Sequence, residues 1–382
     1  MRFKIVHSLL FIFIVISNLV NAQSTTRKII NIPDILGYKT LKCDFHMHTV
    51  FSDGNVWPAF RVEEAWADGL DVIAITDHLG HSKYNKVNPI TLNQSYDIAK
   101  PTADKLGIVL IRGTEITQKM PPGHFDVLFL KDINPLESDD YMASFKAAAE
   151  QGAFIFWNHP GWKQPDDIPV WYDIHSKVYD NGWMNGIEIV NNNYYYPLAL
   201  KWAIEKKLTI FANSDIHDPA TTEFDYLGGQ HRPMTLVFSV DTSQNSIKDA
   251  LLKHRTIVYN NEELIGNEEY LKAIFFGSLN IINPEIVIEA NSHDNYYNFI
   301  KIQNNSCINY KLRLAEKNTE IRTPQDIVLK ANTITILEIR AIPKDIIGEK
   351  NYKLKYFVTN LVKSPTENVE VEISIKVKFI KN

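Results

Sequence analysis

Short apolar segments alternate with helix-like segments between residues 42 and 239, and this alternation limits the possible folds most strongly. Seven apolar segments have the length of strands, at 42–46, 72–76, 108–114, 153–158, 186–190, 208–213 and 235–239. Helix-like stretches lie between them, at 59–67, 92–106, 141–151 and 197–206. Continuous apolar strands separated by helices predict a parallel sheet covered on both faces. Seven such strands predict a closed or nearly closed α/β barrel, with an extra hairpin strand at 124–130.

The pattern changes from about residue 277, where the helical periodicity ends. Residues 369–379 alternate without a fault, with the apolar side chains at Val369, Val371, Ile373, Ile375, Val377 and Phe379. Such alternation is typical of a half-buried antiparallel strand. Shorter runs at 285–290, 333–340 and 352–358 also read as strands. We therefore predict a C-terminal all-β sandwich of about 100 residues, a usual size for that architecture.

The N-terminus has the pattern of an export signal. Arg2 and Lys4 precede an apolar stretch, and a small-residue pattern ends at Ala22. The stretch is shorter than the roughly 20 apolar residues of a membrane-spanning helix. We therefore divide the chain into a signal peptide at 1–22, an α/β barrel domain at 23–276 and a β-sandwich domain at 277–382. The mature protein is expected to be periplasmic or secreted, with no membrane span.

Composition excludes several classes of protein. The chain has 45% apolar residues, as an ordinary globular protein does. Cys43 and Cys307 are the only cysteines, which excludes a disulfide scaffold and a thiolate zinc cluster. Forty basic and 45 acidic residues give a formal charge of −5, and no long basic run is present. A broad nucleic-acid-binding face is therefore not expected.

Histidines and carboxylates gather where the predicted strands end. His46 and His48, spaced by one residue, follow the first strand and point to the same side. Asp53 lies in the same loop, and positions after later strands hold Asp77, His78, Glu115, His124, His159, Asp215 and His217. Active sites of α/β barrels lie at this end of the strands. Imidazole and carboxylate groups ligate zinc and similar metals, so the pattern predicts a metal centre.

These residues, in this order, resemble the polymerase-and-histidinol-phosphatase (PHP) family of metallophosphoesterases. The resemblance rests on H-x-H-T and S-D-G from residue 46, G-L-D-x-I-A-I-T-D-H from residue 69, Glu115, N-H-P-G from residue 158 and S-D-x-H from residue 214. It covers about residues 42–259. The runs at 185–190, 213–219 and 231–238 are most similar to exported Sb-PDE-type phosphodiesterases of that family.

The resemblance implies a distorted seven-stranded (β/α) barrel that holds three divalent metal ions. By position, the first ion would be held by His46, His48, Glu115 and Asp215. Glu115 would bridge to the second, which is completed by His124 and His159. The third would be held by Asp53, His78 and His217. All nine positions are filled, which argues against an inactive copy of the family.

The ligand types indicate hydrolytic chemistry. Nitrogen and oxygen donors suit zinc, manganese or iron, and such ions lower the pKa of bound water to about 7, which makes hydroxide available for attack on phosphorus. Asp215, His217 and Arg232 are the residues expected to act catalytically, with Arg232 gripping a phosphate oxygen. Asp77 is expected to orient a ligand. His81 and His231 are candidate proton donors, and Trp57, Trp162 and residues 194–196 are a candidate aromatic rim.

The preferred function is an exported metal-dependent phosphodiesterase that acts on a small-molecule phosphoester. A phosphomonoesterase, such as a nucleotidase or sugar phosphatase, remains open on the same three metals. A monoester dianion usually calls for extra cations, and few lysines or arginines occupy the predicted strand-end loops. A non-catalytic metal-binding scaffold is a third possibility. The oligomeric state, the natural substrate and the role of the β-domain stay open.

Overall fold

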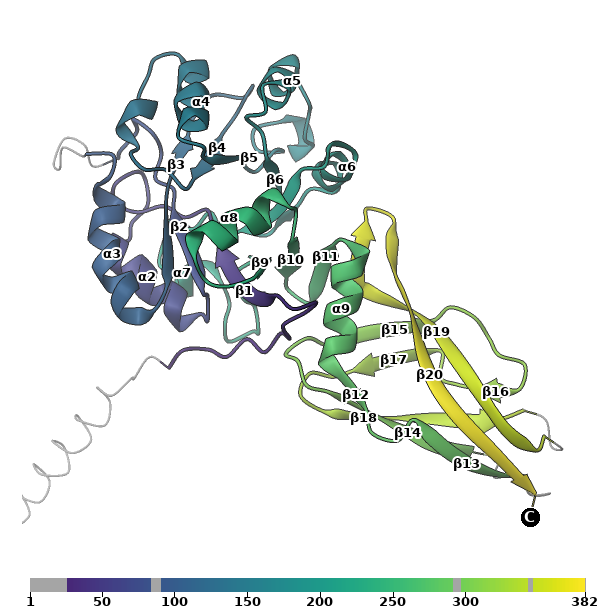
Figure 1. The fold of residues 1–382 in the computed structure, drawn as a ribbon. Coiled ribbons are helices and arrows are strands. Elements are labelled where there is room, and N and C mark those ends of the chain that lie inside the picture. Colours follow the sequence, from purple (N-terminus) through teal and green to yellow (C-terminus); the bar gives the residue numbers. More distant parts are fainter. Residues whose placement is uncertain (1–25, 84–90, 291–296, 343–345, 382) are drawn as a thin grey trace, which may run out of the picture.

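The two predicted parts of the chain form two bodies side by side in a computed structural model (Figure 1). The structure describes residues 26–83, 91–290, 297–342 and 346–381. The predicted signal peptide at 1–22 lies outside the described residues. Within the described ranges, no helix is long and apolar enough to cross a membrane. Cys43 and Cys307 are both free thiols, as expected.

The first body is a curved sheet whose helices lie on its outer side (Figure 1). Its strands are β1 (Lys39–Asp44), β2 (Val72–Ile75), β3 (Val109–Ile116), β4 (Phe125–Leu128), β5 (Phe154–Trp157), β6 (Gly186–Asn191), β7 (Tyr194–Tyr195), β8 (Thr209–Asn213), β9 (Met234–Ser239), β10 (Thr256–Asn260) and β11 (Glu263–Gly266). Strands β1, β2 and β3 run parallel, as do β5, β6 and β8. All seven predicted strands and the hairpin strand β4 are present.

The helices of this body are α2 (Pro58–Ala67), α3 (Gln94–Leu106), α4 (Tyr141–Glu150), α5 (Asp173–Asp180), α6 (Pro197–Lys206), α7 (Ala220–Glu223), α8 (Gln244–Leu252) and α9 (Glu268–Ser278). Local sequence sets several of their ends. Proline begins α2 and α6, where a missing N–H costs nothing. The Asp140 side chain caps α4 by accepting from the Met142 amide. Gly107 ends α3 in the left-handed conformation that glycine adopts without strain.

The barrel departs from the prediction in the direction of one strand. Strand β9 runs antiparallel to β1, whereas a parallel strand was expected. The chain between β8 and β9 holds only the short helix α7 and no crossover helix, so β9 starts at the end where β8 stops. No backbone ladder joins β8 to β9 among the described strands, so the barrel is not closed. Instead, the side chain of Thr235 on β9 bonds to the backbone of Ala212 on β8. Its hydroxyl donates to the Ala212 carbonyl and accepts from the Ala212 amide.

The second body is the predicted β-sandwich. One sheet contains β13 (Glu285–Ala290), β15 (Tyr310–Leu314), β17 (Asp326–Leu329), β19 (Gly348–Ser364) and β20 (Glu367–Lys381). The other contains β12 (Leu279–Ile281), β14 (Tyr297–Asn304), β16 (Ile321–Arg322) and β18 (Ile334–Ala341). The alternating residues of β20 from Val369 to Phe379 are buried, which confirms the predicted half-buried strand. The predicted domain boundary between residues 276 and 277 falls at the end of α9.

The two bodies share a sheet edge and a core. Strand β11 pairs in parallel with β19, with Leu264 opposite Leu361 and Ile265 opposite Val362. Ile274 and Phe275 of α9 belong to the same buried cluster as Tyr310 and Tyr356 of the sandwich. The sandwich is therefore packed firmly against the barrel.

Candidate metal centre

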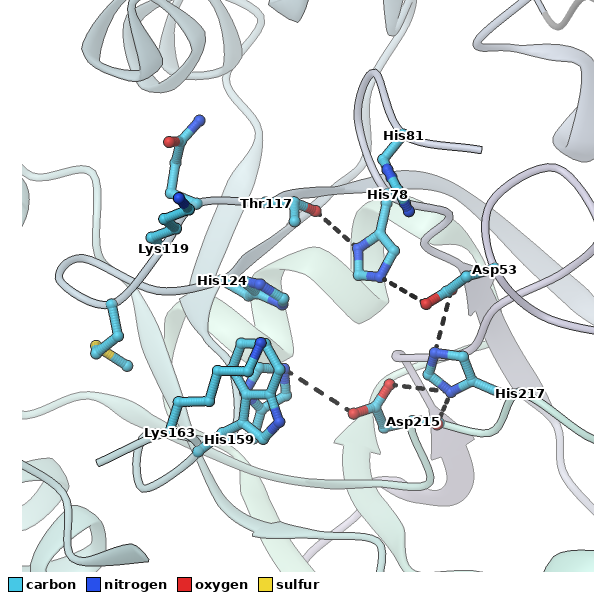
Figure 2. A pocket seen from close by; sticks show the side chains of 13 residues that line it. Asp53, His78, His81, Thr117, Lys119, His124, His159, Lys163, Asp215 and His217 are labelled. Atoms are coloured by element: carbon cyan, nitrogen blue, oxygen red, sulfur yellow. Dashed lines mark hydrogen bonds and ion pairs between the residues drawn. The ribbon is translucent and has the colours of Figure 1, made fainter. Parts of the chain in front are cut away.

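A cavity of about 810 Å³ opens beyond the carboxyl ends of the parallel strands. Six of the nine predicted ligands line it, namely Asp53, His78, His124, His159, Asp215 and His217 (Figure 2). The other three, His46, His48 and Glu115, are fully buried beneath it. The structure therefore brings all nine predicted ligands to one place.

The floor of the cavity is built on the loops after β1 and β8. The Asp215 amide donates to the His46 carbonyl at 2.9 Å, and the His48 amide donates to the Ile216 carbonyl at 3.0 Å. These bonds tie the two loops together just where the barrel ladder is missing. As a result, Asp215 Oδ1 lies 3.2 Å from His46 Nε2 and 3.1 Å from His48 Nε2. The two Nε2 atoms are 3.1 Å apart.

Glu115, at the end of β3, occupies the centre of the cluster. Its Oε1 atom lies 3.0 Å from His124 Nδ1 and 3.5 Å from both His159 Nε2 and His46 Nε2. Its Oε2 atom is paired with His78 Nδ1. A single carboxylate thus faces four imidazoles, which is the geometry expected of a bridging ligand.

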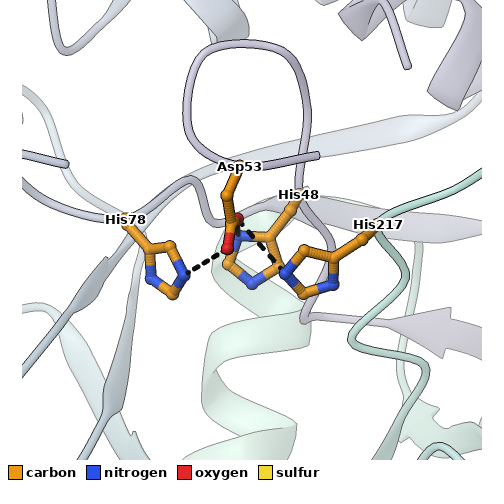
Figure 3. A group of neighbouring side chains, drawn as sticks. All are labelled: His48, Asp53, His78 and His217. Carbon is orange, nitrogen blue, oxygen red and sulfur yellow. Dashed lines mark ion pairs between the residues drawn. The ribbon is translucent and has the colours of Figure 1, made fainter. Parts of the chain in front are cut away.

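Asp53 lies between His78 and His217 and contacts both, as Figure 3 shows. Its carboxylate lies 3.4 Å from His78 Nε2 and 3.2 Å from His217 Nε2. His48 stacks on His217 with ring centroids 4.3 Å apart. The loop carrying Asp53 turns tightly at Gly54, where an added Cβ would lie 2.8 Å from the backbone of His48.

The nine side chains form four groups, and within each group the potential ligand atoms lie within 4.8 Å of one another. They are His46, His48 and Asp215; His46, Glu115 and His159; His78, Glu115 and His124; and His48, Asp53, His78 and His217. These groups contain all nine predicted ligands but divide them differently from the three predicted sets. Glu115 is grouped once with His46 and His159 and once with His78 and His124, so no group contains both His124 and His159.

The electrostatics of the cluster fit bound cations. Burial lowers the pKa of His48 to about 3, helped by the neighbouring His78 and His217, so its ring stays neutral as a metal ligand requires. Burial also disfavours a charged Glu115, but His124 and His78 outweigh it and hold its pKa well below the usual range. Glu115 Oε2 is buried without a well-formed hydrogen bond among the described residues. Buried carboxylates among imidazoles are a donor set for divalent ions.

Glu188 on β6 is a functional residue that the sequence analysis missed. It is fully buried, and its Oε1 atom lies 3.0 Å from His46 Nδ1. Its Oε2 atom accepts from the His159 amide at 2.7 Å, and Asn213 donates to Oε1 at 2.9 Å. The available signal was a lone carboxylate within the apolar run Gly186–Asn191. Such a partner fixes the ring orientation and tautomer of a ligating histidine.

Asp77 plays the predicted orienting role, through Ser52. Its Oδ1 atom accepts from the Ser52 hydroxyl at 2.8 Å, and Ser52 Oγ lies 3.2 Å from His48 Nδ1. Asp77 also accepts from the amide and the hydroxyl of Thr49. Asp77, which follows β2, therefore fixes the loop between His48 and Asp53.

Arg61 was not expected at the site, yet it ties the ligand loops together from beneath. This arginine of α2 is fully buried. Its Nη2 atom donates to the carbonyls of His48 at 3.1 Å and His217 at 3.0 Å, while Nη1 donates to the carbonyl of Asp218 at 3.0 Å. Since the contacts are to backbone carbonyls, no local sequence motif marks this role.

Arg232 does not reach the cavity, and this corrects the expectation that it grips a phosphate oxygen. It is fully buried and lies outside the cavity lining. Its guanidinium pairs with Asp44 at 3.2 Å and with Asp68 at 2.8 Å. Two buried carboxylates thus take the donors that a phosphate would need.

The remaining candidates divide between the cavity and the surface. His81 lines the cavity, whereas His231 interacts with the carbonyls of Arg232 and Asn261 elsewhere. Of the aromatic rim, only Trp162 lines the cavity. Trp57 and Tyr194 are exposed outside it. The rim is therefore smaller than predicted.

Comparison with known proteins supports both parts of the chain. Residues 44–305 match the family model of the PHP domain, and residues 286–374 match that of an Ig-like domain. The structure is similar to a two-domain protein from Bacteroides vulgatus described as containing a predicted PHP-like metal-dependent phosphoesterase. That protein is 40% identical, with a TM-score of 0.85 over 92% of this chain and 99% of its own.

A curated relative is an uncharacterised protein of Methanocaldococcus jannaschii. It is 39% identical over 82 residues, which are 22% of this chain. The match spans 36% of the length of that protein. The structural similarity to the Bacteroides vulgatus protein covers both the barrel and the sandwich.

Proposed function

This chain belongs to the PHP domain family of metal-dependent phosphoesterases, and on that premise we propose that it is an exported phosphodiesterase. The observation that supports catalysis most strongly is the complete set of nine ligand side chains around one open cavity. A non-catalytic scaffold would have no need for an open cavity beside an intact metal centre.

We assign the centre three divalent ions, zinc, manganese or iron. The first would be held by His46, His48, Glu115 and Asp215, the second by Glu115, His124 and His159, and the third by Asp53, His78 and His217. Such ions polarise phosphoryl oxygens and activate water at neutral pH.

Other residues of the chain hold the ligand side chains in position. Glu188 and the Asp77–Ser52 pair fix the rings of His46 and His48 from behind. Arg61 fixes the backbone of the loops that carry His48 and His217. Preorganised ligands need no rearrangement when the substrate arrives, which is the main protein contribution to phosphoryl transfer.

The absence of a fixed arginine supports a diester substrate. Within the described residues, no arginine lines the cavity. Arg232 is buried on Asp44 and Asp68, and Arg112 donates to Asn93 and Asp97. A diester carries one negative charge, whereas a monoester dianion calls for further cationic donors.

One observation favours the phosphomonoesterase alternative. Lys119 and Lys163 line the cavity, and both could meet the extra charge of a monoester if they reached the scissile phosphate. A comparison of 4-nitrophenyl phosphate with bis(4-nitrophenyl) phosphate, at fixed pH and metal, separates the two functions. We expect the larger kcat/KM for the diester. A clear preference for the monoester would make the phosphatase reading the better one, and no hydrolysis of either would favour the scaffold.

Export rests on the signal-like pattern at residues 1–22. The protein recovered from the periplasm or the medium of an expressing bacterium should begin at Gln23. Retention of the full chain in the cytoplasm would contradict export without touching the proposed chemistry.

A further inference from the structure

The outer wall of the cavity carries two lysines that the proposed chemistry does not use. Lys119 lies in the loop between β3 and β4, and Lys163 lies in the loop after β5. Both are exposed, and both line the same cavity as the ligand side chains. Figure 2 shows them on the side of His124 and His159, across the cavity from Asp53 and His217.

The charge around these lysines is unbalanced. The acidic residues of the cavity lining are Asp53 and Asp215, and both face the histidines of the metal centre. The wall next to the lysines is made by Thr117, Gln118, Met120 and Trp162, none of which is acidic. Within the described part of the chain, neither Lys119 nor Lys163 forms an ion pair. Two ammonium groups therefore face the cavity with their charge available.

Lys163 is also held in place near the centre. Its Nζ atom lies 3.9 Å from the centroid of the Trp162 ring. That ring packs on His124 and His159, with centroid distances of 4.7 and 5.2 Å. A cation over an indole face is attracted to it. The ammonium group therefore lies against an indole that itself packs on two side chains of the second ligand set.

We propose that Lys119 and Lys163 form a subsite for a second anionic group, a carboxylate or a phosphate, on the arm of the substrate that extends out of the cavity. The proposal rests on the proposed phosphodiesterase function and narrows its substrate class. The cavity volume of about 810 Å³ is that of a site for a whole organic molecule, larger than a phosphate group needs. The natural substrate is then an organic phosphodiester with a remote negative charge.

The test uses three 4-nitrophenyl phosphodiesters with one leaving group and alkyl arms that end in a methyl ester, a carboxylate or a phosphate. Wild-type kcat/KM should be higher for an anionic arm than for the neutral arm. The carboxylate and phosphate arms show which anion the subsite prefers. Lys119→Gln and Lys163→Gln should each lower kcat/KM for the anionic arms about two- to fivefold, mainly through KM, as for partly exposed ion pairs.

The neutral arm separates this subsite from a general effect of charge. For the phosphodiester whose arm ends in a methyl ester, kcat/KM should change less than twofold in either variant. Lys131→Gln, an exposed lysine outside the cavity, should leave all three substrates unaffected. Raising the ionic strength should reduce the wild-type preference for anionic arms, because salt screens exposed charges.

Two results would overturn the proposal. Equal losses on neutral and anionic arms would show that the lysines act on the scissile phosphate, and unchanged kinetics on the anionic arms would show that they bind nothing. If the wild-type protein hydrolysed none of the diesters, the proposed function would fail instead. Calorimetric binding of the matching non-hydrolysable phosphonate monoesters, in which a methylene replaces the leaving-group oxygen, to wild-type and variant proteins would still decide whether the subsite exists.

Discussion

Glu188 shows how a single side chain can control the metal centre without touching an ion. It contacts the outer ring nitrogen of His46 and the backbone of His159, which belong to different ligand sets. The substitution Glu188→Gln keeps the shape of the side chain but removes its negative charge, which weakens it as a hydrogen-bond acceptor for His46 and His159. We expect a 10- to 100-fold loss of metal affinity, the usual effect of removing such a partner, with the fold retained. Competition with a chelator, followed by metal analysis, measures this loss.

Glu137→Gln is the matched control, because Glu137 is an exposed carboxylate outside the ligand groups. Unchanged metal affinity in Glu188→Gln, with the control behaving alike, would show that Glu188 is only a buried polar residue of β6.

The clustering of the nine candidate ligands was predictable because they follow apolar strands, and parallel strands end on one side of a sheet. Glu188 and Arg61 were not predictable in the same way. Glu188 sits inside a strand, and its partners His46 and Asn213 come from distant segments. Arg61 recognises carbonyls that lie 13 and 156 residues away, so only the folded chain reveals them. Arg232 was expected to grip a phosphate, because its partners Asp44 and Asp68 are far from it in the sequence.

At the scale of elements, Arg232 links three parts of the barrel. It precedes β9, while Asp44 ends β1 and Asp68 caps the end of α2. Arg232→Met would leave these carboxylates without their shared cation. We expect a loss of about 3–5 kcal/mol in the free energy of unfolding, as for breaking other buried ion pairs. Urea denaturation measures it.

The kinetics of Arg232→Met test the correction directly. Loss of a phosphate contact would lower kcat/KM more than about tenfold, since a hydrogen bond to a charged group is worth about 1.5–3 kcal/mol. We expect a far smaller change in folded protein. A tenfold fall through KM with unchanged stability would return Arg232 to the phosphate site.

The ion pair between Asp68 and Arg232 should make the stability of the barrel depend on pH. Burial raises the pKa of Asp68, but Arg232, Tyr226 and Lys28 more than offset it and leave the pKa below its usual value. A carboxyl group whose pKa is lower in the folded state stabilises the fold above its unfolded pKa of about 3.9, and this stabilisation is lost as the pH falls below that value. In Asp68→Asn, the free energy of unfolding should therefore fall less steeply below about pH 4. Parallel pH profiles for the two proteins would refute this.

The elements themselves were largely foreseeable, and the exceptions have physical causes. Apolar runs bounded by glycine marked the barrel strands, and strict alternation marked β20. The direction of β9 was missed because it depends on where the chain re-enters the sheet, which no local pattern encodes. Strand β14 was missed because an exposed Phe299 and a buried Asn304 break its alternation, and β17 because it is short and exposes Val328. Strand β15 alternates regularly, but its five residues are too few to stand out.

The whole molecule should unfold as one unit. Strand β19 extends the barrel sheet through β11, and one buried cluster contains side chains of both bodies. Separating the bodies would expose that shared core, so neither is expected to melt alone. Calorimetry of the protein should show a single transition whose calorimetric and van't Hoff enthalpies agree. Two resolved transitions would show that the sandwich is an independent module.

The central claim is that nine side chains from the whole barrel hold a cluster of divalent metal ions. Anomalous diffraction from crystals of the metal-loaded protein, at the absorption edge of the bound metal, tests it most directly. We predict three peaks beside the side chains assigned above, with histidine nitrogens at about 2.0–2.2 Å as for zinc and similar ions. In Asp215→Asn, the peak between His46 and His48 should weaken or vanish. An absence of peaks at these residues in fully loaded protein, or peaks at other sites only, would contradict the account.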